Sequence, residues 1–189
     1  MLKRLSAWLS RLSTGRVALA ALVIFLVFTA LVLPRQASTA EENSVAARSP
    51  DLSFYYSAGY LYRLAEAYGQ AGRAAFVRTR FTFDVIWPLL YTFTLVTAIS
   101  WAFGKAFSPG SPWQMANLAP VFGMLFDFLE NISTSLVMLR YPQPTPVLDS
   151  LASVFTMLKW VTLSTSFVLL LAGGIVALWR RLSPAKKTL

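Results

Sequence analysis

Four long apolar runs constrain this chain more than any other feature of its sequence. A helix that crosses a membrane needs roughly 20 mostly apolar residues. Lipid offers no partners for backbone N–H and C=O groups, so apolar runs of this length are expected to be helical. The predicted spans cover residues 17–33, 81–104, 115–139 and 151–179. The sequence therefore predicts an all-α integral membrane protein with four transmembrane helices.

The composition agrees with membrane insertion and removes several classes of site. Of the 189 residues, 56% are hydrophobic and only 13% are charged, whereas a soluble domain carries about 25% charged residues. The chain has no cysteine and no histidine, which excludes disulfides, Cys/His zinc sites and a Ser-His-Asp triad. The net charge is +9, but no nucleic-acid-binding motif accompanies it. We expect neither a nucleic-acid partner nor a cofactor.

The first apolar run has two interpretations. A basic leader precedes it, and the small residues Ser38-Thr39-Ala40 resemble a signal-peptidase cleavage pattern. A signal peptide would then end near residue 40. The run at 17–33 is longer than the apolar region of about 7–15 residues in such peptides, which favours a retained anchor. Residue 41 lies on the outer side in either case.

Lysine and arginine near the spans predict the orientation. Four spans divide the connecting segments between two sides, and short basic segments tend to remain in the cytoplasm. One side holds nine of these residues and the other holds seven, most of them in a long loop where they carry less weight. We predict a multi-pass protein of the cell membrane with both termini cytoplasmic. The segments on the cytoplasmic side are 1–16, 105–114 and 180–189, and those on the outer side are 34–80 and 140–150.

The long first outer loop is expected to contain a further helix. Ser49-Pro50-Asp51 resembles a helix start, with a capping serine, a proline in the first turn and an acid near the positive helix end. Phe54, Leu61 and Tyr68 belong to an apolar face with helical spacing. The pattern predicts an amphipathic helix at about 50–77 that lies on the outer leaflet. The alternative is a cover over a site between the spans.

Four ionisable residues fall inside the apolar runs: Asp84, Asp127, Glu130 and Lys159. Each costs about 2.5–3.5 kcal/mol at the centre of a membrane, so such side chains normally face one another inside the bundle. At 1.5 Å per residue, Glu130 and Lys159 both lie roughly 13 Å from the outer ends of their helices, and Asp127 lies roughly 18 Å deep. A short turn joins these helices. We therefore expect Lys159 to pair with Glu130 before Asp127.

The candidate site lies between the second, third and fourth spans, in the outer half of the bilayer. Its core is the cluster Asp84, Asp127, Glu130, Asn131 and Lys159. The supporting side chains are Arg80, Tyr91, Thr134, Thr156 and Thr162. If Arg80 offsets Asp84, one further carboxylate needs a proton, a cation or a ligand. The alternative is that the cluster only holds the helices together, at about 0.6 kcal/mol per polar contact.

Three functions fit this pattern. The first is a non-catalytic protein that binds a lipid, a small amphiphile or a partner helix, and it is the one we favour. The second is a membrane-embedded hydrolase or transferase that uses Asp84, Asp127 and Glu130. The third is a proton- or cation-coupled transport component, which would need a second copy or another membrane protein as a partner. Asp127 and Glu130 make only a weak metal-binding pattern, because acids three apart are common on helices.

Overall fold

The computed structural model describes residues 1–43, 49–50 and 53–183, and the side chains of all of these except 36–43. All regular secondary structure in these residues is helical. The elements are α1 (Leu2–Leu12), α2 (Gly15–Asn43), α3 (Ala58–Arg80), α4 (Phe83–Ala106), the 3-10 helix η2 (Pro112–Leu118), α5 (Ala119–Arg140) and α6 (Leu148–Leu182). Within these described residues, four helical stretches are long and apolar enough to cross a membrane: Gly15–Arg35, Ala58–Ala106 (α3 with α4), Pro112–Arg140 (η2 with α5) and Leu148–Leu182.

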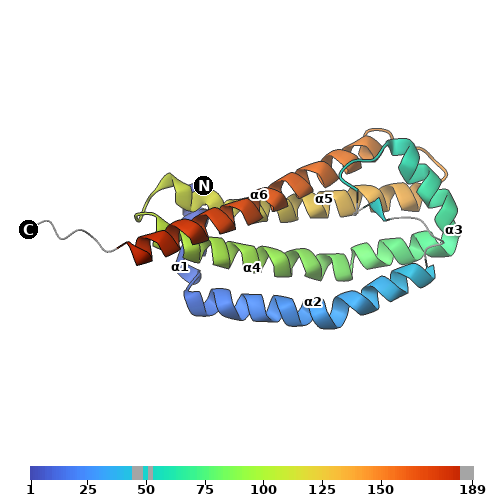
Figure 1. Cartoon of the computed structure of the whole chain (residues 1–189). Coiled ribbons are helices and arrows are strands. Elements are labelled where there is room, and N and C mark those ends of the chain that lie inside the picture. The colour runs from blue at the N-terminus through green and yellow to red at the C-terminus, as the bar shows by residue number, and fades with distance from the viewer. Residues whose placement is uncertain (44–48, 51–52, 184–189) are drawn as a thin grey trace, which may run out of the picture.

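The long helices α2, α4, α5 and α6 run side by side and define the axis of the molecule (Figure 1). α1, η2 and the last turns of α6 lie at one end, which we call the terminal end. α3 and the turn between α5 and α6 lie at the opposite end, which we call the α3 end. The N-terminus and the last described turn of α6 therefore lie at the same end of the bundle.

The core forms where α4, α5 and α6 pack together. Leu95, Ile99 and Phe103 of α4 are buried and contact apolar side chains of α6. α2 packs on α4 along one face, while its side chains at Leu19 and Ile24 remain exposed. The polar cluster therefore lies in the packed part of the bundle, and α2 is peripheral to it.

α3 differs from the helix that the sequence predicts. It begins at Ala58, and the Ser57 hydroxyl accepts a hydrogen bond from the Tyr60 N–H at 3.3 Å. The predicted start near residue 50 is therefore displaced, and residue 51 lies outside the described residues. α3 is also broken at Gly69, whose φ of 59° and ψ of −176° are not helical. Glycine adopts such a conformation without steric cost, because it has no Cβ atom.

Two segments at the terminal end are partly helical. α1 lies in the predicted basic tail 1–16, and η2 begins in the predicted loop 105–114. Asn117 of η2 is completely buried, and its side-chain amide donates to the Ser6 carbonyl at 3.1 Å. The same amide donates to the hydroxyls of Ser10 at 3.1 Å and Ser100 at 2.9 Å. These bonds fix α1 against η2 and α4. The bonds to Ser6 and Ser10 join residues more than a hundred positions apart, which helical spacing does not reveal.

A pair of adjacent glycines tests the contact between α4 and α6. A Cβ atom added at Gly173 would clash with the Phe103 ring, whereas one added at Gly174 would meet nothing within 4 Å. We expect Gly173→Ala to lower the free energy of unfolding by about 1–3 kcal/mol through overpacking. Gly174→Ala should change it by no more than about 0.5 kcal/mol. Unfolding of the detergent-purified variants measures both values, and equal effects would contradict this packing.

Candidate functional site

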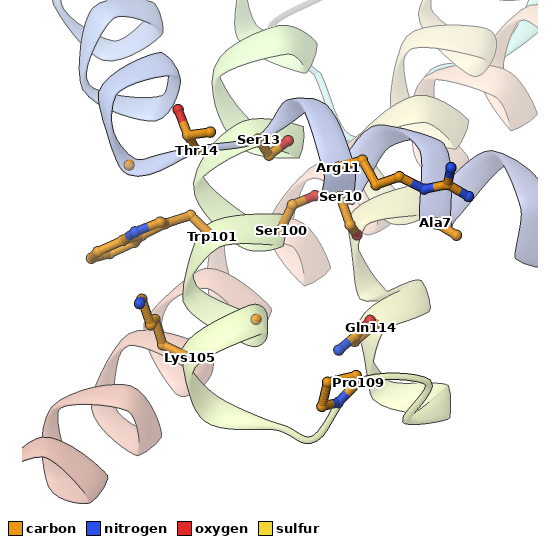
Figure 2. Close-up of a pocket in the computed structure, with 12 residues that line it drawn as sticks. Ala7, Ser10, Arg11, Ser13, Thr14, Ser100, Trp101, Lys105, Pro109 and Gln114 are labelled. Atoms are coloured by element: carbon orange, nitrogen blue, oxygen red, sulfur yellow. The ribbon is translucent and has the colours of Figure 1, made fainter.

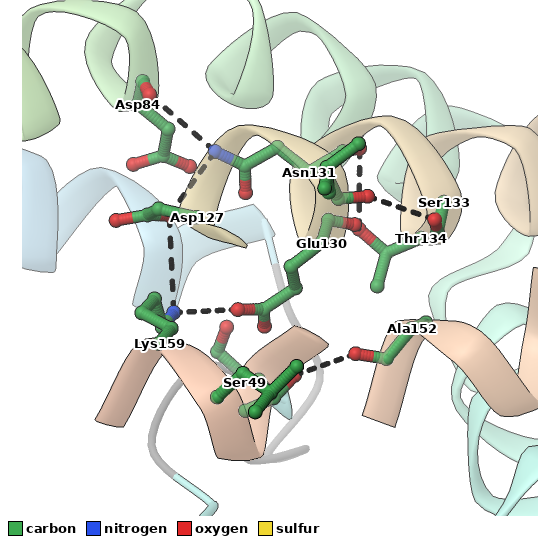
Figure 3. Close-up of polar contacts among 12 residues, drawn as sticks. Ser49, Asp84, Asp127, Glu130, Asn131, Ser133, Thr134, Ala152 and Lys159 are labelled. Carbon is green, nitrogen blue, oxygen red and sulfur yellow. Dashed lines mark hydrogen bonds and ion pairs between the residues drawn. The ribbon is translucent and has the colours of Figure 1, made fainter. Parts of the chain in front are cut away.

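The ammonium of Lys159 on α6 lies between two carboxylates of α5 (Figure 3). Its Nζ is 2.6 Å from Glu130 Oε2 and 3.8 Å from Asp127 Oδ1. The Glu130 side chain is 0% exposed, and Lys159 and Asp127 are also buried. The predicted order of the two distances is confirmed. It follows from the short connection between α5 and α6, which places residues of equal depth side by side.

Asp127 of α5 contacts side chains of both α4 and α6. The Tyr91 hydroxyl of α4 donates to Asp127 Oδ2 at 2.8 Å. Asn131, one turn along the same face of α5, donates to Asp127 Oδ1 at 3.4 Å. Its amide also lies 3.4 Å from the backbone carbonyl of Asp84. Asp127 therefore shares one ammonium with Glu130 and accepts two further hydrogen bonds.

A second ion pair lies beside the first, at the junction of α3 and α4. Arg80 Nη1 is 2.7 Å from Asp84 Oδ2, and the arginine side chain is only 5% exposed. Arg80 Nη2 donates to the Ser49 hydroxyl at 3.3 Å. The guanidinium also lies 4.4 Å over the ring of Phe76. Arg80 therefore offsets Asp84, the condition under which one further carboxylate was left to be neutralised, and Asn131 connects this ion pair to the Lys159 cluster.

The segment before α3 covers the cluster from the α3 end. The Thr156 hydroxyl of α6 donates to the Tyr56 hydroxyl at 3.0 Å, and the Tyr56 N–H donates to the Ser153 hydroxyl at 3.3 Å. Thr156 and Ser153 lie one and two turns from Lys159 on α6. Tyr56 is not among the site residues that the sequence pattern predicts. No local spacing could have done so, since Tyr56 and Thr156 are 100 positions apart.

Two of the predicted supporting residues bond within their own helices. The Thr134 hydroxyl donates to the Glu130 carbonyl at 2.9 Å. The Thr162 hydroxyl donates to the Leu158 carbonyl at 2.7 Å. Such bonds satisfy a hydroxyl inside an apolar helix without another partner. Neither hydroxyl donates to a charged side chain of the cluster.

Asp149, a further buried acid near the α3 end, was not predicted. The Tyr62 hydroxyl of α3 donates to Asp149 Oδ2 at 3.0 Å and accepts from the Thr145 N–H at 2.7 Å. Asp149 lies in the first turn of α6, where a negative charge complements the helix dipole. This set fastens α3 to the turn between α5 and α6.

Asp127 and Glu130, which form the weak metal-binding pattern, both pair with Lys159 in the structure. The Lys159 ammonium lies between the two carboxylates, where a bound cation would otherwise sit. In the part of the chain that the structure describes, no three Asp or Glu side chains converge as a metal-binding set. The two residues therefore act as partners of Lys159.

The cluster combines two cations, three carboxylates, an amide and several hydroxyls inside a helix bundle. Such an arrangement can hold helices in register or exchange its internal partners for a charged headgroup. No protein-family model, characterised protein or solved structure matches this chain. The function is therefore argued from the geometry of the cluster.

Proposed function

We propose that the chain is a multi-pass protein of the cell membrane that binds the headgroup of a lipid or small amphiphile at the Lys159 cluster, without catalysis. The observation that carries the proposal is the sharing of one buried ammonium by two carboxylates, at 2.6 Å and 3.8 Å. Asp127 is the more distant partner. A cationic group on an entering amphiphile would therefore bind first at Asp127.

Membrane insertion is supported by the faces that the bundle leaves exposed. Large apolar side chains of α2 and α6, such as Leu19, Ile24, Val168, Leu171 and Ile175, are exposed. Helices that are apolar on faces turned away from the bundle are typical of proteins whose solvent is lipid. The segments 1–16, 105–114 and 180–189 hold nine lysine and arginine residues, against seven in the long loop and the turn on the other side, and by the positive-inside rule we assign the terminal end to the cytoplasm.

In this orientation α3 lies at the outer surface, above the cluster. Phe54 and Tyr55 precede the helix and are exposed, and aromatic rings are favoured at the interface between lipid and water. Glu130 and Lys159 lie ten and eleven residues from the outer ends of α5 and α6, which is roughly 15 Å. An amphiphile from the outer leaflet would approach the cluster past Tyr56.

Headgroup binding is tested by thermal unfolding of the detergent-purified chain with single-chain lipids that carry choline, ethanolamine or glycerol headgroups. We expect stabilisation by the cationic headgroups, reaching about 2.7 kcal/mol when the free amphiphile is at 100 times its Kd. Asp127→Asn keeps the size of the side chain and its acceptor for Tyr91 but removes the charge. It should abolish the stabilisation.

Thr162→Ala is the matched control, because Thr162 lies on α6 one turn from Lys159 and its hydroxyl bonds within its own helix. It should respond to the amphiphiles like the unmodified chain. Equal responses of Asp127→Asn and Thr162→Ala would contradict headgroup binding at the cluster. If no headgroup stabilised the chain, the cluster would serve only to hold the helices together.

The proposed orientation predicts that the two ends of α6 lie on opposite sides of the membrane. A reporter inserted after Gln143, in the turn between α5 and α6, should be read on the outer side. The same reporter fused to the C-terminus should be read in the cytoplasm. Because a single helix separates the two points, the opposite readouts also test whether α6 spans the membrane. Finding both reporters on one side would refute the proposed topology.

The hydrolase or transferase alternative requires the carboxylates of Asp84 and Asp127 to work as an acid/base pair. Each of them has its own short contact instead, Asp84 with Arg80 and Asp127 with Tyr91. These contacts support binding over catalysis. If the function were cation-coupled transport, the inorganic cation of the buffer should stabilise the chain against thermal unfolding, and the amphiphiles should not.

A further inference from the structure

Two adjoining hollows lie at the terminal end, away from the Lys159 cluster (Figure 2). The first is an open hollow of about 600 Å³ between α1, α4 and the loop before η2, and the second is an open hollow of about 720 Å³ beside the start of α2. Both are bordered by Thr14, Gly15 and Trp101. Their shared border makes them one continuous candidate site, in a region that the sequence analysis treated as a tail and a loop.

The charge around the hollows is entirely positive. Arg11 and Lys105 line the first hollow and Arg16 lines the second, and neither hollow is lined by an acid. In Figure 2, Lys105 and Trp101 extend from α4 to one side, and Arg11 extends from α1 to the other side, away from them. Among the described residues, no carboxylate forms an ion pair with these three cations. The hollow therefore favours an anion.

The polar groups around the first hollow suit a phosphate. Ser10 and Ser100 contribute hydroxyls, and Gln114 contributes an amide. α2 begins beside the hollow at Gly15 and has no acid in its first turn, so the positive end of its dipole is not neutralised there. Phosphate oxygens accept hydrogen bonds from such donors and pair with Arg and Lys.

The second hollow gives the site an apolar side. It is bordered by Leu19 of α2, which is 63% exposed, and by the Trp101 ring. A Cβ atom on Gly15 would lie 2.9 Å from Trp101 Nε1, so only glycine lets the indole pack this closely at the border of the two hollows. α1 beside them exposes Leu2, Leu5, Trp8 and Leu12 at helical spacing. The surroundings therefore suit a ligand with a charged head and an apolar tail.

We propose that these hollows bind the phosphate headgroup of an anionic membrane lipid. The phosphate lies in the first hollow, whose lining includes Arg11 and Lys105, and Arg16 lines the adjoining second hollow. The acyl chain leaves through the second hollow along α2, past Leu19. This site is separate from the Lys159 cluster and does not depend on the function proposed for it.

The test uses the full chain in nanodiscs that contain phosphatidylcholine and phosphatidylglycerol in equal amounts. Native mass spectrometry after release from the nanodiscs counts the lipids retained by the protein. We expect phosphatidylglycerol to be retained preferentially, and Arg11→Gln with Lys105→Gln to reduce that preference roughly tenfold. The matched control is Lys3→Gln with Arg181→Gln, which removes two charges from the same end of the molecule without touching the hollows. It should keep the preference.

A charge-conserving variant, Arg11→Lys with Lys105→Arg, should also retain phosphatidylglycerol and separates loss of binding from loss of folding. Equal losses in the glutamine variant and its control would mean that only the general positive charge attracts the lipid, and would overturn the proposal. Preference unaffected by the glutamine variant would overturn it as well. Inorganic phosphate is added in a separate arm. If it displaced the lipid at millimolar concentration, the source of the phosphate would be the free ion.

Discussion

Replacing Lys159 by methionine is expected to lower the free energy of unfolding by about 3–5 kcal/mol. The substitution leaves Glu130 and Asp127 without the ammonium that lies 2.6 Å and 3.8 Å from them. The cost arises because Glu130 is completely buried and has no access to water. Glu130→Gln should cost a similar amount, since it leaves the lysine with only its more distant carboxylate partner in the α5 face.

The double variant, Lys159→Met with Glu130→Gln, should be more stable than the sum of the two losses predicts. Removing both partners eliminates the isolated charge that makes each single variant costly. Unfolding of the four proteins in one detergent, followed by tryptophan fluorescence, provides the cycle. Strictly additive losses would contradict the pairing. If Asp127→Asn rescued Lys159→Met better than Glu130→Gln did, Asp127 would be the dominant partner.

The second large effect is expected at the junction of α3 and α4. Arg80→Met should lower the free energy of unfolding by about 3 kcal/mol, because it removes the guanidinium that lies 2.7 Å from the carboxylate of Asp84, a side chain only 15% exposed. It also removes the donor to Ser49. Arg78→Met is the matched control, because Arg78 is exposed two residues earlier on the same helix. That variant should stay within about 0.5 kcal/mol of the unmodified chain.

Limited proteolysis distinguishes the cause of the Arg80 effect from general instability. If Arg80 holds the segment before α3 through Ser49, cleavage around residues 49–57 should accelerate in Arg80→Met and remain slow in Arg78→Met. Equal stability of the two arginine variants would mean that the Arg80–Asp84 contact contributes nothing to the fold. The ion pair would then have no part in positioning α3 over the cluster.

The polar face of α5 could be predicted because its residues are close in sequence. Asp127, Glu130 and Asn131 recur at helical spacing, and a short turn brings Lys159 to the same depth. These are local relations, which helical geometry fixes. The pairing of Lys159 with Glu130 follows from them. The four apolar runs follow from composition in the same way.

Contacts between distant segments could not be predicted by the same reasoning. Tyr56 meets Thr156 because α3 folds over the end of α6, and nothing in the local pattern of either residue indicates the other. The break at Gly69 was missed because a glycine within an amphipathic pattern is compatible with a continuous helix. α1 docks through the buried amide of Asn117, a residue that looks like part of an ordinary polar loop.

Native mass spectrometry of the protein, extracted from its own membrane in a mild detergent, distinguishes binding of an amphiphile at the Lys159 cluster from a role that only joins helices. We predict that the unmodified chain and the Thr162→Ala control retain one amphiphile with a cationic headgroup, and that Asp127→Asn loses it while still eluting as a folded species. Retention of the same molecule by Asp127→Asn, or the absence of any such molecule from the unmodified chain, would contradict the account.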